Sequence, residues 1–199
     1  LLNLAERYDA MLIVDDAHGL GVINHGYGAF AEHTVWSERL ILIGTFSKAA
    51  GSYGGYVCAS QVWVDLLTNV ARSLIYSTAL PPSVIAANIA ALEWMGKHPA
   101  AAEKVLYNAR KFTSLLKLPQ AQSAIVPWIV GSEQSALQAS EFLQEKGFFV
   151  GAIRPPTVPD HTSRLRITFS ALHTDDQIVR LVEAITLLSK EEKQWQQSA

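Results

Sequence analysis

The chain has 199 residues, 49% of them hydrophobic and 17% charged, which is enough apolar material to bury a sizeable core. Its formal net charge of −2 argues against a general attraction to nucleic acid or to an anionic membrane, and no apolar run approaches the ~20 residues that span a bilayer. Cys58 is the single cysteine, which excludes an internal disulfide and indicates a reducing, cytoplasmic compartment.

The first predicted elements are a helix end and two buried strands. Residues 1–8 have the pattern of the end of an amphipathic helix without initiator Met or signal peptide, so we expect the chain to be part of a longer fold. The apolar runs at 10–14 and 40–44 predict strands covered on both faces, as in a parallel sheet, although runs this short also fit buried helix. The roughly thirty residues between them suffice for the crossover that parallel neighbours require.

A third strand and two helices are expected next. Residues 54–59 predict the strand, and apolar residues over 62–74 then recur at helical spacing. The Pro-Pro pair at 81–82 fits the start of another helix that ends near Gly96. These elements together predict one domain over residues 1–97.

The remainder of the chain, residues 98–199, predicts a small α+β domain. Gly147 is a suitable stop for one of its helices, and Thr174 with Gln177 forms a capping box for the last one. The polar tail from Lys190 onward is expected to fray. The predicted elements are a helix over 100–117, a strand over 123–130, a helix over 133–146, strands over 148–153 and 164–170, and a helix over 175–190.

Two acids and an imidazole follow the first strand, at Asp15, Asp16 and His18. Ligands of open α/β sheets bind beyond the carboxyl ends of strands, so the position suits a site. Three interpretations stay open: a metal site, although adjacent residues of a strand point to opposite sides; a structural turn capped by Asp16; or an acid and a ring that contact a cofactor. The nearby glycines do not form a dinucleotide fingerprint, because the third glycine is absent and the acids precede them.

A second cluster follows the strand at 40–44, where Thr45, Ser47 and Lys48 lie in a glycine-rich turn without P-loop spacing. An exposed loop lysine is the plain alternative. Lysines are nevertheless rarely placed between core strands without a partner, and the two hydroxyls suit a phosphate.

Together the two clusters supply a lysine nucleophile, an acid and phosphate donors at neighbouring strand ends, which is the set that pyridoxal 5'-phosphate (PLP) needs. The lysine forms a Schiff base, the acid keeps the pyridine nitrogen protonated, and the charged ring withdraws electrons from the substrate. Burial of the lysine would favour its neutral form.

These clusters resemble the signature stretches of the α-oxoamine synthases, a fold-type-I PLP family. The resemblance implies an α/β fold in which residues 1–97 are the later part of the large, mostly parallel PLP domain and residues 98–199 are the small α+β domain. The other half of that fold, with the glycine-rich phosphate loop and the residue that stacks on the cofactor ring, is not in this chain. The matching stretches are residues 15–21, 45–51, 76–82, 123–127, 153–159 and 164–168.

The resemblance implies a role for each matching residue of the two clusters. Lys48 would be the Schiff-base lysine and would later move the substrate α-proton. Asp15 would pair with the pyridine nitrogen, and His18 would hydrogen-bond the ring hydroxyl oxygen. Thr45, with Ser47 beside it, would hold the cofactor phosphate.

Further roles are implied outside the two clusters. Ser77 and Thr78 would reach the phosphate of a neighbouring subunit. Thr157 and Arg166 would line the substrate site, and Arg166 would bind the amino-acid carboxylate, since a guanidinium pairs with a carboxylate through two hydrogen bonds. The alternation around Arg166 places Arg164 on the same face of a strand, where we expect a solvated edge.

The implied activity is the decarboxylating condensation of L-alanine with a pimeloyl thioester of CoA or acyl carrier protein, in biotin synthesis. A homodimer is implied, because sites of this fold form near a subunit interface; no metal, nucleic acid or membrane is expected. Two alternatives stay open: glycine C-acetyltransferase or another member with a different acyl donor, and a non-catalytic fragment that mediates dimer contacts. We do not expect this chain alone to catalyse the reaction.

Overall fold

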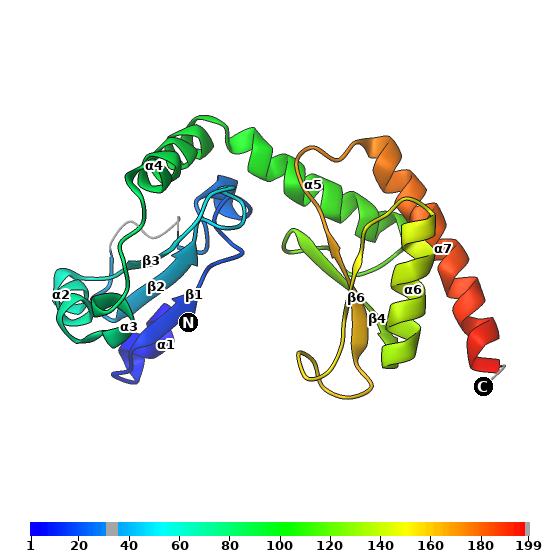
Figure 1. The fold of residues 1–199 in the computed structure, drawn as a ribbon, viewed down its shortest axis with the longest axis horizontal. Coiled ribbons are helices and arrows are strands. Elements are labelled where there is room, and N and C mark those ends of the chain that lie inside the picture. Colours follow the sequence, from blue (N-terminus) through cyan, green and yellow to red (C-terminus); the bar gives the residue numbers. More distant parts are fainter. Residues whose placement is uncertain (31–35, 198–199) are drawn as a thin grey trace. The chain divides into compact units, whose positions relative to one another are not determined.

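The computed structural model of the chain describes residues 1–30 and 36–197, with side chains to residue 189. The chain divides into two compact units, residues 1–103 and 104–199, which are described separately (Figure 1). At the end of the first unit, the Glu103 carboxylate lies 2.9 Å from Nδ1 of His25. This division comes slightly after residue 97, and the domain boundary expected there remains a prediction. Among the described residues no helix is long and apolar enough to cross a membrane.

The first unit contains a three-stranded sheet in the order β1-β2-β3. In the described part of this unit, one helix precedes the sheet in the chain, and three follow it. The expected strands and the helix that opens the chain are confirmed. The single helix expected over 62–74 is broken at Ala71, which has extended backbone angles. The elements are α1 (Leu2–Arg7), β1 (Leu12–Asp15), the 3-10 turn η1 (Asn24–Gly26), β2 (Leu40–Thr45), β3 (Gly55–Cys58), α2 (Gln61–Val70), α3 (Arg72–Ile75) and α4 (Pro82–Lys97).

The strands β1 and β2 are parallel, as the sequence predicts, and pair Leu12 with Leu40 and Asp15 with Ile43. The strand β3 instead runs antiparallel to β2. A parallel return needs a crossover of a dozen or more residues, and residues 46–54 are too few. Because β1 and β2 run the same way, Asp15 and Thr45 end at the same edge of the sheet.

One face of this sheet is open in the chain. Ile13 is 63% exposed, Ile43 39% and Val57 43%, so the described residues cover this face only in part. The expectation that both faces would be covered is therefore wrong for this chain by itself.

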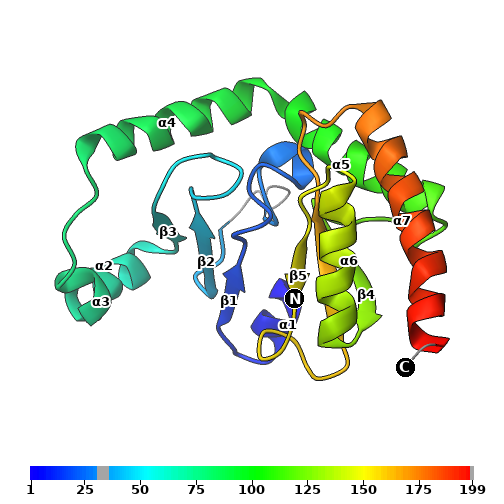
Figure 2. The same ribbon diagram turned by 45° about the vertical axis from the view of Figure 1, so that its right-hand side comes forward.

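The second unit has an antiparallel sheet in the order β4-β6-β5, with β6 in the centre. Figures 1 and 2 show α6 lying beside α7 and against the sheet. The core of this unit is mainly apolar, and its fully buried hydrophobic members include Phe112, Leu143, Leu165, Ile185 and Leu188. The elements are α5 (Pro99–Leu115), β4 (Ile125–Gly131), α6 (Glu133–Glu145), β5 (Gly151–Ile153), β6 (Ser163–Thr168) and α7 (Asp175–Gln197).

The predicted helix ends in this unit are largely confirmed. Gly147 has φ +86 just after α6, and the capping box is formed, because Thr174 N–H donates to Gln177 Oε1 at 2.9 Å and Gln177 N–H to Thr174 Oγ1 at 3.2 Å. The end expected for the last helix at residue 190 is wrong, since α7 continues to Gln197. The polar residues there are good helix formers, and neither Gly nor Pro stops them.

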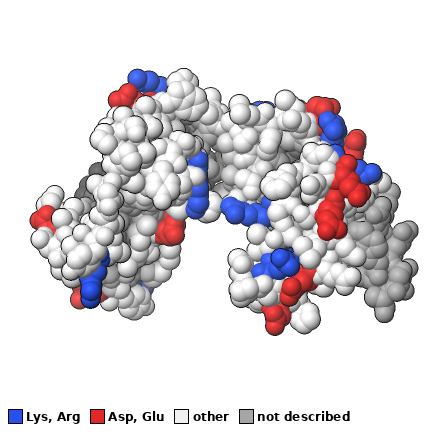
Figure 3. Space-filling model, in the orientation of Figure 1, with Lys and Arg blue, Asp and Glu red and all other residues white. Residues whose placement is uncertain are grey.

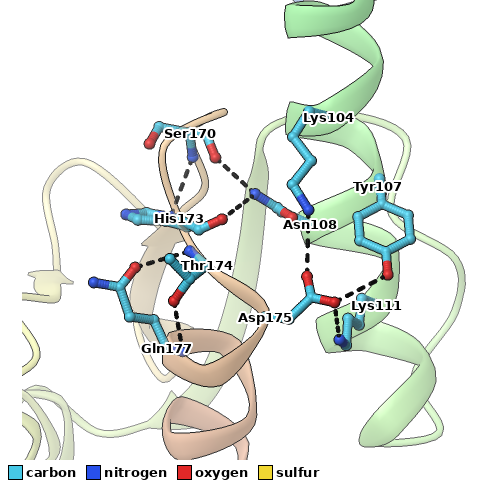
Figure 4. A network of polar contacts seen from close by, with 9 residues as sticks. All are labelled: Lys104, Tyr107, Asn108, Lys111, Ser170, His173, Thr174, Asp175 and Gln177. Atoms are coloured by element: carbon cyan, nitrogen blue, oxygen red, sulfur yellow. Dashed lines mark hydrogen bonds and ion pairs between the residues drawn. The ribbon is translucent and has the colours of Figure 1, made fainter.

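Polar contacts tie α5 to the start of α7 (Figure 4). Asp175 accepts from Lys111 at 2.7 Å and from Lys104 at 3.3 Å, and these hydrogen bonds lower the pKa of its carboxyl. Asn108, which is fully buried, donates to the carbonyl of Ser170 at 2.9 Å and to that of His173 at 3.0 Å. The acid in the first turn also suits the helix dipole, so this network fixes where α7 begins.

Charged side chains of both signs are spread over the surface. On the face drawn in Figure 3, Lys and Arg lie singly or beside Asp and Glu. That face therefore has no continuous basic patch of the kind that binds nucleic acid.

Candidate cofactor site

The two acids at the end of β1 have different surroundings. Asp15 is exposed, on the same face as Ile13, and its Oδ1 accepts the N–H of Ala17 at 2.9 Å. Asp16 is only 6% exposed. Asp15 is therefore open to a ligand at this face of the sheet, whereas the buried Asp16 is not.

Asp16 organises the loop that follows β1. Its Oδ2 accepts the N–H of Ala29 at 2.9 Å, and its carboxylate lies where a side chain on Gly19 or Gly28 would be. Burial raises the pKa of Asp16, the bond from Ala29 lowers it, and the charge of Asp15 raises it again. Of the three interpretations, the structural turn therefore describes Asp16, while the Asp15 carboxylate is available for a cofactor.

The close approach of the Asp16 carboxylate to Gly28, whose φ is +87, allows a prediction for a substitution at Gly28. Gly28→Ala should destabilise the first unit by about 2–3 kcal/mol, because the new methyl group meets Asp16 Oδ2 and the left-handed backbone is strained as well. Urea denaturation followed by circular dichroism measures the loss.

The matched control for Gly28 is Gly51→Ala. Gly51 also has positive φ, +62, but a methyl group there would meet nothing within 4 Å. This variant should lose only about 1 kcal/mol. Equal losses in the two variants would mean that Asp16 moves aside without cost.

A compact set of hydroxyls and backbone groups precedes Lys48. Thr45 Oγ1 donates to the carbonyl of Gly54 at 3.1 Å and lies 2.8 Å from Ser47 Oγ. The Ser47 N–H donates to Thr45 Oγ1 at 3.2 Å. Two hydroxyls are thus gathered at the end of β2, immediately before the lysine.

Lys48 itself is exposed, so the burial expected for it from the sequence is not seen in this chain. His18 is also exposed, in the turn over residues 17–19. The parallel strands bring Asp15 to the same edge as Thr45 and Lys48, so this edge carries a carboxylate, an imidazole, two hydroxyls and an amine. That donor set fits PLP, which needs a lysine, an acid for its ring nitrogen and donors for its phosphate.

The remaining predicted site residues lie apart from this cluster in the chain. Ser77 and Thr78 are exposed between α3 and α4, and Ser77 Oγ donates to the carbonyl of Leu74 at 2.9 Å. In this chain Ser77 thus bonds to its own helix, and its reach to a neighbouring subunit remains a prediction.

The predicted substrate residues, Thr157 and Arg166, belong to the second unit. Both are exposed, and Arg166 alternates on β6 with the buried Leu165 and Ile167. The edge position expected for Arg164 is wrong, because β6 is the central strand of its sheet. Arg164 is half-buried, and its Nε donates to the carbonyl of Thr162 at 2.9 Å.

Metal binding was one of the interpretations open for the acids. Within residues 1–30 and 36–189, whose side chains the structure describes, no three His, Cys, Asp or Glu side chains are grouped so that they could hold an ion.

Asn88 of α4 is a residue that the motif analysis missed. It is 5% exposed, and its Nδ2 donates to the carbonyl of Tyr53, in the same turn as Lys48, at 3.1 Å. The sequence feature that could have identified it is a single amide side chain in a helix that is otherwise apolar over residues 84–92.

Comparison with known proteins gives a consistent result. The sequence profile of the family described as "Aminotransferase class I and II" matches residues 1–185. The 8-amino-7-oxononanoate synthase of Granulibacter bethesdensis is 50% identical over 185 residues, which are 93% of this chain and 47% of that protein.

Two solved structures have similar folds. The 8-amino-7-oxononanoate synthase of Francisella tularensis has a TM-score of 0.81 at 28% identity, over 96% of this chain and 57% of that one. An SPT structure that contains PLP has a TM-score of 0.86 at 26% identity, over 96% of this chain and 50% of that one. The chain spans about half the length of the curated relatives that it matches.

Proposed function

The chain belongs to the class I and II aminotransferase family, and from that premise we propose that it forms the lysine-bearing half of a PLP-dependent α-oxoamine synthase. Lys48 would hold the cofactor covalently, Asp15 would pair with its pyridine nitrogen and His18 with its ring hydroxyl. Thr45 and Ser47 hold its phosphate. Ser77 and Thr78 reach the phosphate of a partner copy in a homodimer.

The observation that carries this proposal is the parallel pairing of β1 and β2, which brings Asp15 and the Lys48 turn to one sheet edge. Ligand sites of open α/β sheets lie beyond such carboxyl ends. The relatives of known name and the PLP-containing neighbour support the same cofactor.

When bound, the cofactor supplies an electron sink for negative charge that develops at the substrate α-carbon. Each residue of the chain has a part in this reaction. The Asp15 carboxylate keeps a proton on the ring nitrogen, and its bond from the Ala17 N–H holds it in place. The Lys48 amine takes the α-proton from the substrate and later returns one.

The substrates that we propose are L-alanine and a pimeloyl thioester, joined with loss of carbon dioxide to give 8-amino-7-oxononanoate. The name of the Granulibacter relative supports this choice. The alternative is another synthase of this type, such as a glycine C-acetyltransferase, which uses a different amino acid and acyl donor.

Product analysis separates these candidates. Mass spectrometry would follow reactions with L-alanine and pimeloyl-CoA and with glycine and acetyl-CoA. Each reaction is run with the chain alone and with the amino-terminal half of the Granulibacter relative as a companion. Product from pimeloyl-CoA only, and only with the companion, is expected. Product from acetyl-CoA only would replace the proposed substrates, and self-association without any product or PLP uptake would favour the non-catalytic alternative.

Arg166→Lys should raise the KM for L-alanine roughly 10- to 100-fold, because the planar guanidinium makes two charged hydrogen bonds with a carboxylate that an ammonium cannot reproduce. Steady-state kinetics of the assembled enzyme measures the change. Arg164→Lys, on the same face of β6 and bonded to the Thr162 carbonyl, is the matched control and should leave the KM unchanged. An unchanged KM in Arg166→Lys would exclude this role.

A further inference from the structure

The turn that carries Lys48, residues 46–54 and here called the lysine loop, is closed by its own backbone. Phe46 N–H donates to the Gly54 carbonyl at 2.9 Å, and Ser52 N–H donates to the Phe46 carbonyl at 2.9 Å. The Gly54 carbonyl also accepts from Thr45 Oγ1 at 3.1 Å. The Tyr53–Gly54 segment is therefore the point where the far end of the loop joins the end of β2.

A side chain from α4 holds this junction from outside. Asn88 Nδ2 donates to the carbonyl of Tyr53 at 3.1 Å. The neighbouring Gly54, with φ +110, packs so closely on Leu80 that a methyl group there would lie 2.6 Å from Leu80 Cδ1. Figure 2 shows α4 running past the end of the sheet at which β2 finishes.

The residue type at position 88 is best explained by that hydrogen bond. Of the residues of α4, all of which are described, only Asn88 is buried. Its Oδ1 is buried without a partner, which opposes folding, whereas an apolar side chain would avoid this cost. What the amide adds is its donor, and that donor is used on the lysine loop.

We propose that Asn88 is a positioning residue for Lys48. It fixes the Tyr53–Gly54 segment, which in turn fixes Thr45 and the start of the lysine loop. As far as it concerns the cofactor, this inference rests on the proposed function. Its effect on the loop itself does not depend on any ligand.

Hydrogen exchange of the chain measured by mass spectrometry tests the effect on the loop. Asn88→Leu should speed exchange of the lysine-loop amides about fivefold, the effect of losing one hydrogen bond, and leave the amides of β1 and β2 unchanged. Asn108→Leu is the matched control, because Asn108 is another buried amide whose Oδ1 is unpaired. Its Nδ2 donates to two backbone carbonyls. This variant should speed exchange only around residues 170–174.

Unchanged exchange in the lysine loop, or an equal increase throughout the sheet, would overturn the proposal. If circular dichroism shows that Asn88→Leu does not fold, Asn88→Ala gives the same comparison, since it also lacks the donor and introduces neither a larger side chain nor a charge.

A second readout concerns the cofactor. In a PLP titration Asn88→Leu should raise the concentration for half-maximal visible absorbance about fivefold, and Asn108→Leu should not. A normal half-saturation concentration in a variant with a faster-exchanging loop would overturn the positioning role. If the wild-type chain takes up no PLP by itself, the titration is repeated with the companion half present. Absence of uptake there too would count against the cofactor site, and the exchange comparison would still decide whether Asn88 holds the loop.

Discussion

Lys48→Ala should abolish the visible absorbance band that appears when the chain is titrated with PLP. Free PLP also absorbs close to the visible range, so the readout is the additional band that appears when the aldehyde bonds to an amine, and an alanine has none to offer. The loss should be complete, because Lys48 is the only lysine of the glycine-rich turn at the carboxyl end of β2. Absorbance spectra recorded during the titration measure it.

The matched control is Lys97→Ala, which removes another exposed lysine of the first unit, from the end of α4. It should bind PLP like the wild type. A saturable band that persists in Lys48→Ala would assign the covalent bond to another lysine. If the wild-type chain gives no band, the same three proteins are compared with the companion half present, which tests whether the other wall of the pocket is needed.

Asp15→Asn should lower the turnover number of the assembled enzyme by a factor on the order of 10²–10³, the cost of removing one preorganised electrostatic partner. The amide keeps the size of the side chain and can still accept from the Ala17 N–H, so the fold should be retained. It carries no charge, so it no longer favours a proton on the pyridine nitrogen. Steady-state kinetics at saturating substrate gives the number.

Asp16→Asn is the control that the structure offers for Asp15. Asp16 is buried in the loop after β1 and accepts the Ala29 N–H, so its replacement should change stability far more than turnover. Burial raises the pKa of its carboxyl above 3.8, so the folded state binds the proton more tightly than the unfolded state. The contribution of Asp16 to stability is therefore largest below pH 3.8 and falls as the pH rises through the raised pKa, a slope that the variant should lack. Equal losses of turnover in the two variants would contradict the assignment of Asp15.

Much of the fold was predictable because local patterns determine it. The apolar runs before Asp15 and Thr45, the capping box at Thr174 and the stop at Gly147 are each confirmed. The direction of β3 also follows from the sequence, through the short connection that precedes it.

Other features depend on contacts between distant residues and could not be read from patterns. The helix break at Ala71 could not be predicted, because neither glycine nor proline occurs there. The different roles of two adjacent acids, Asp15 and Asp16, appear only when the loop to Ala29 is folded. Asn88 was missed for the same reason, since its partner Tyr53 is 35 residues away.

The pairing within each sheet also bears on the order in which the chain folds. The strands β1 and β2 can bond only after the long segment between residues 15 and 40 has closed, whereas β5 and β6 are joined by a short connection. Closing a longer loop costs more chain entropy before any contact compensates for it. We therefore expect the strand that carries Arg166 to pair with β5 before the sheet edge that carries Asp15 and Lys48 assembles. PLP uptake thus reports that the pairing of β1 with β2 is complete.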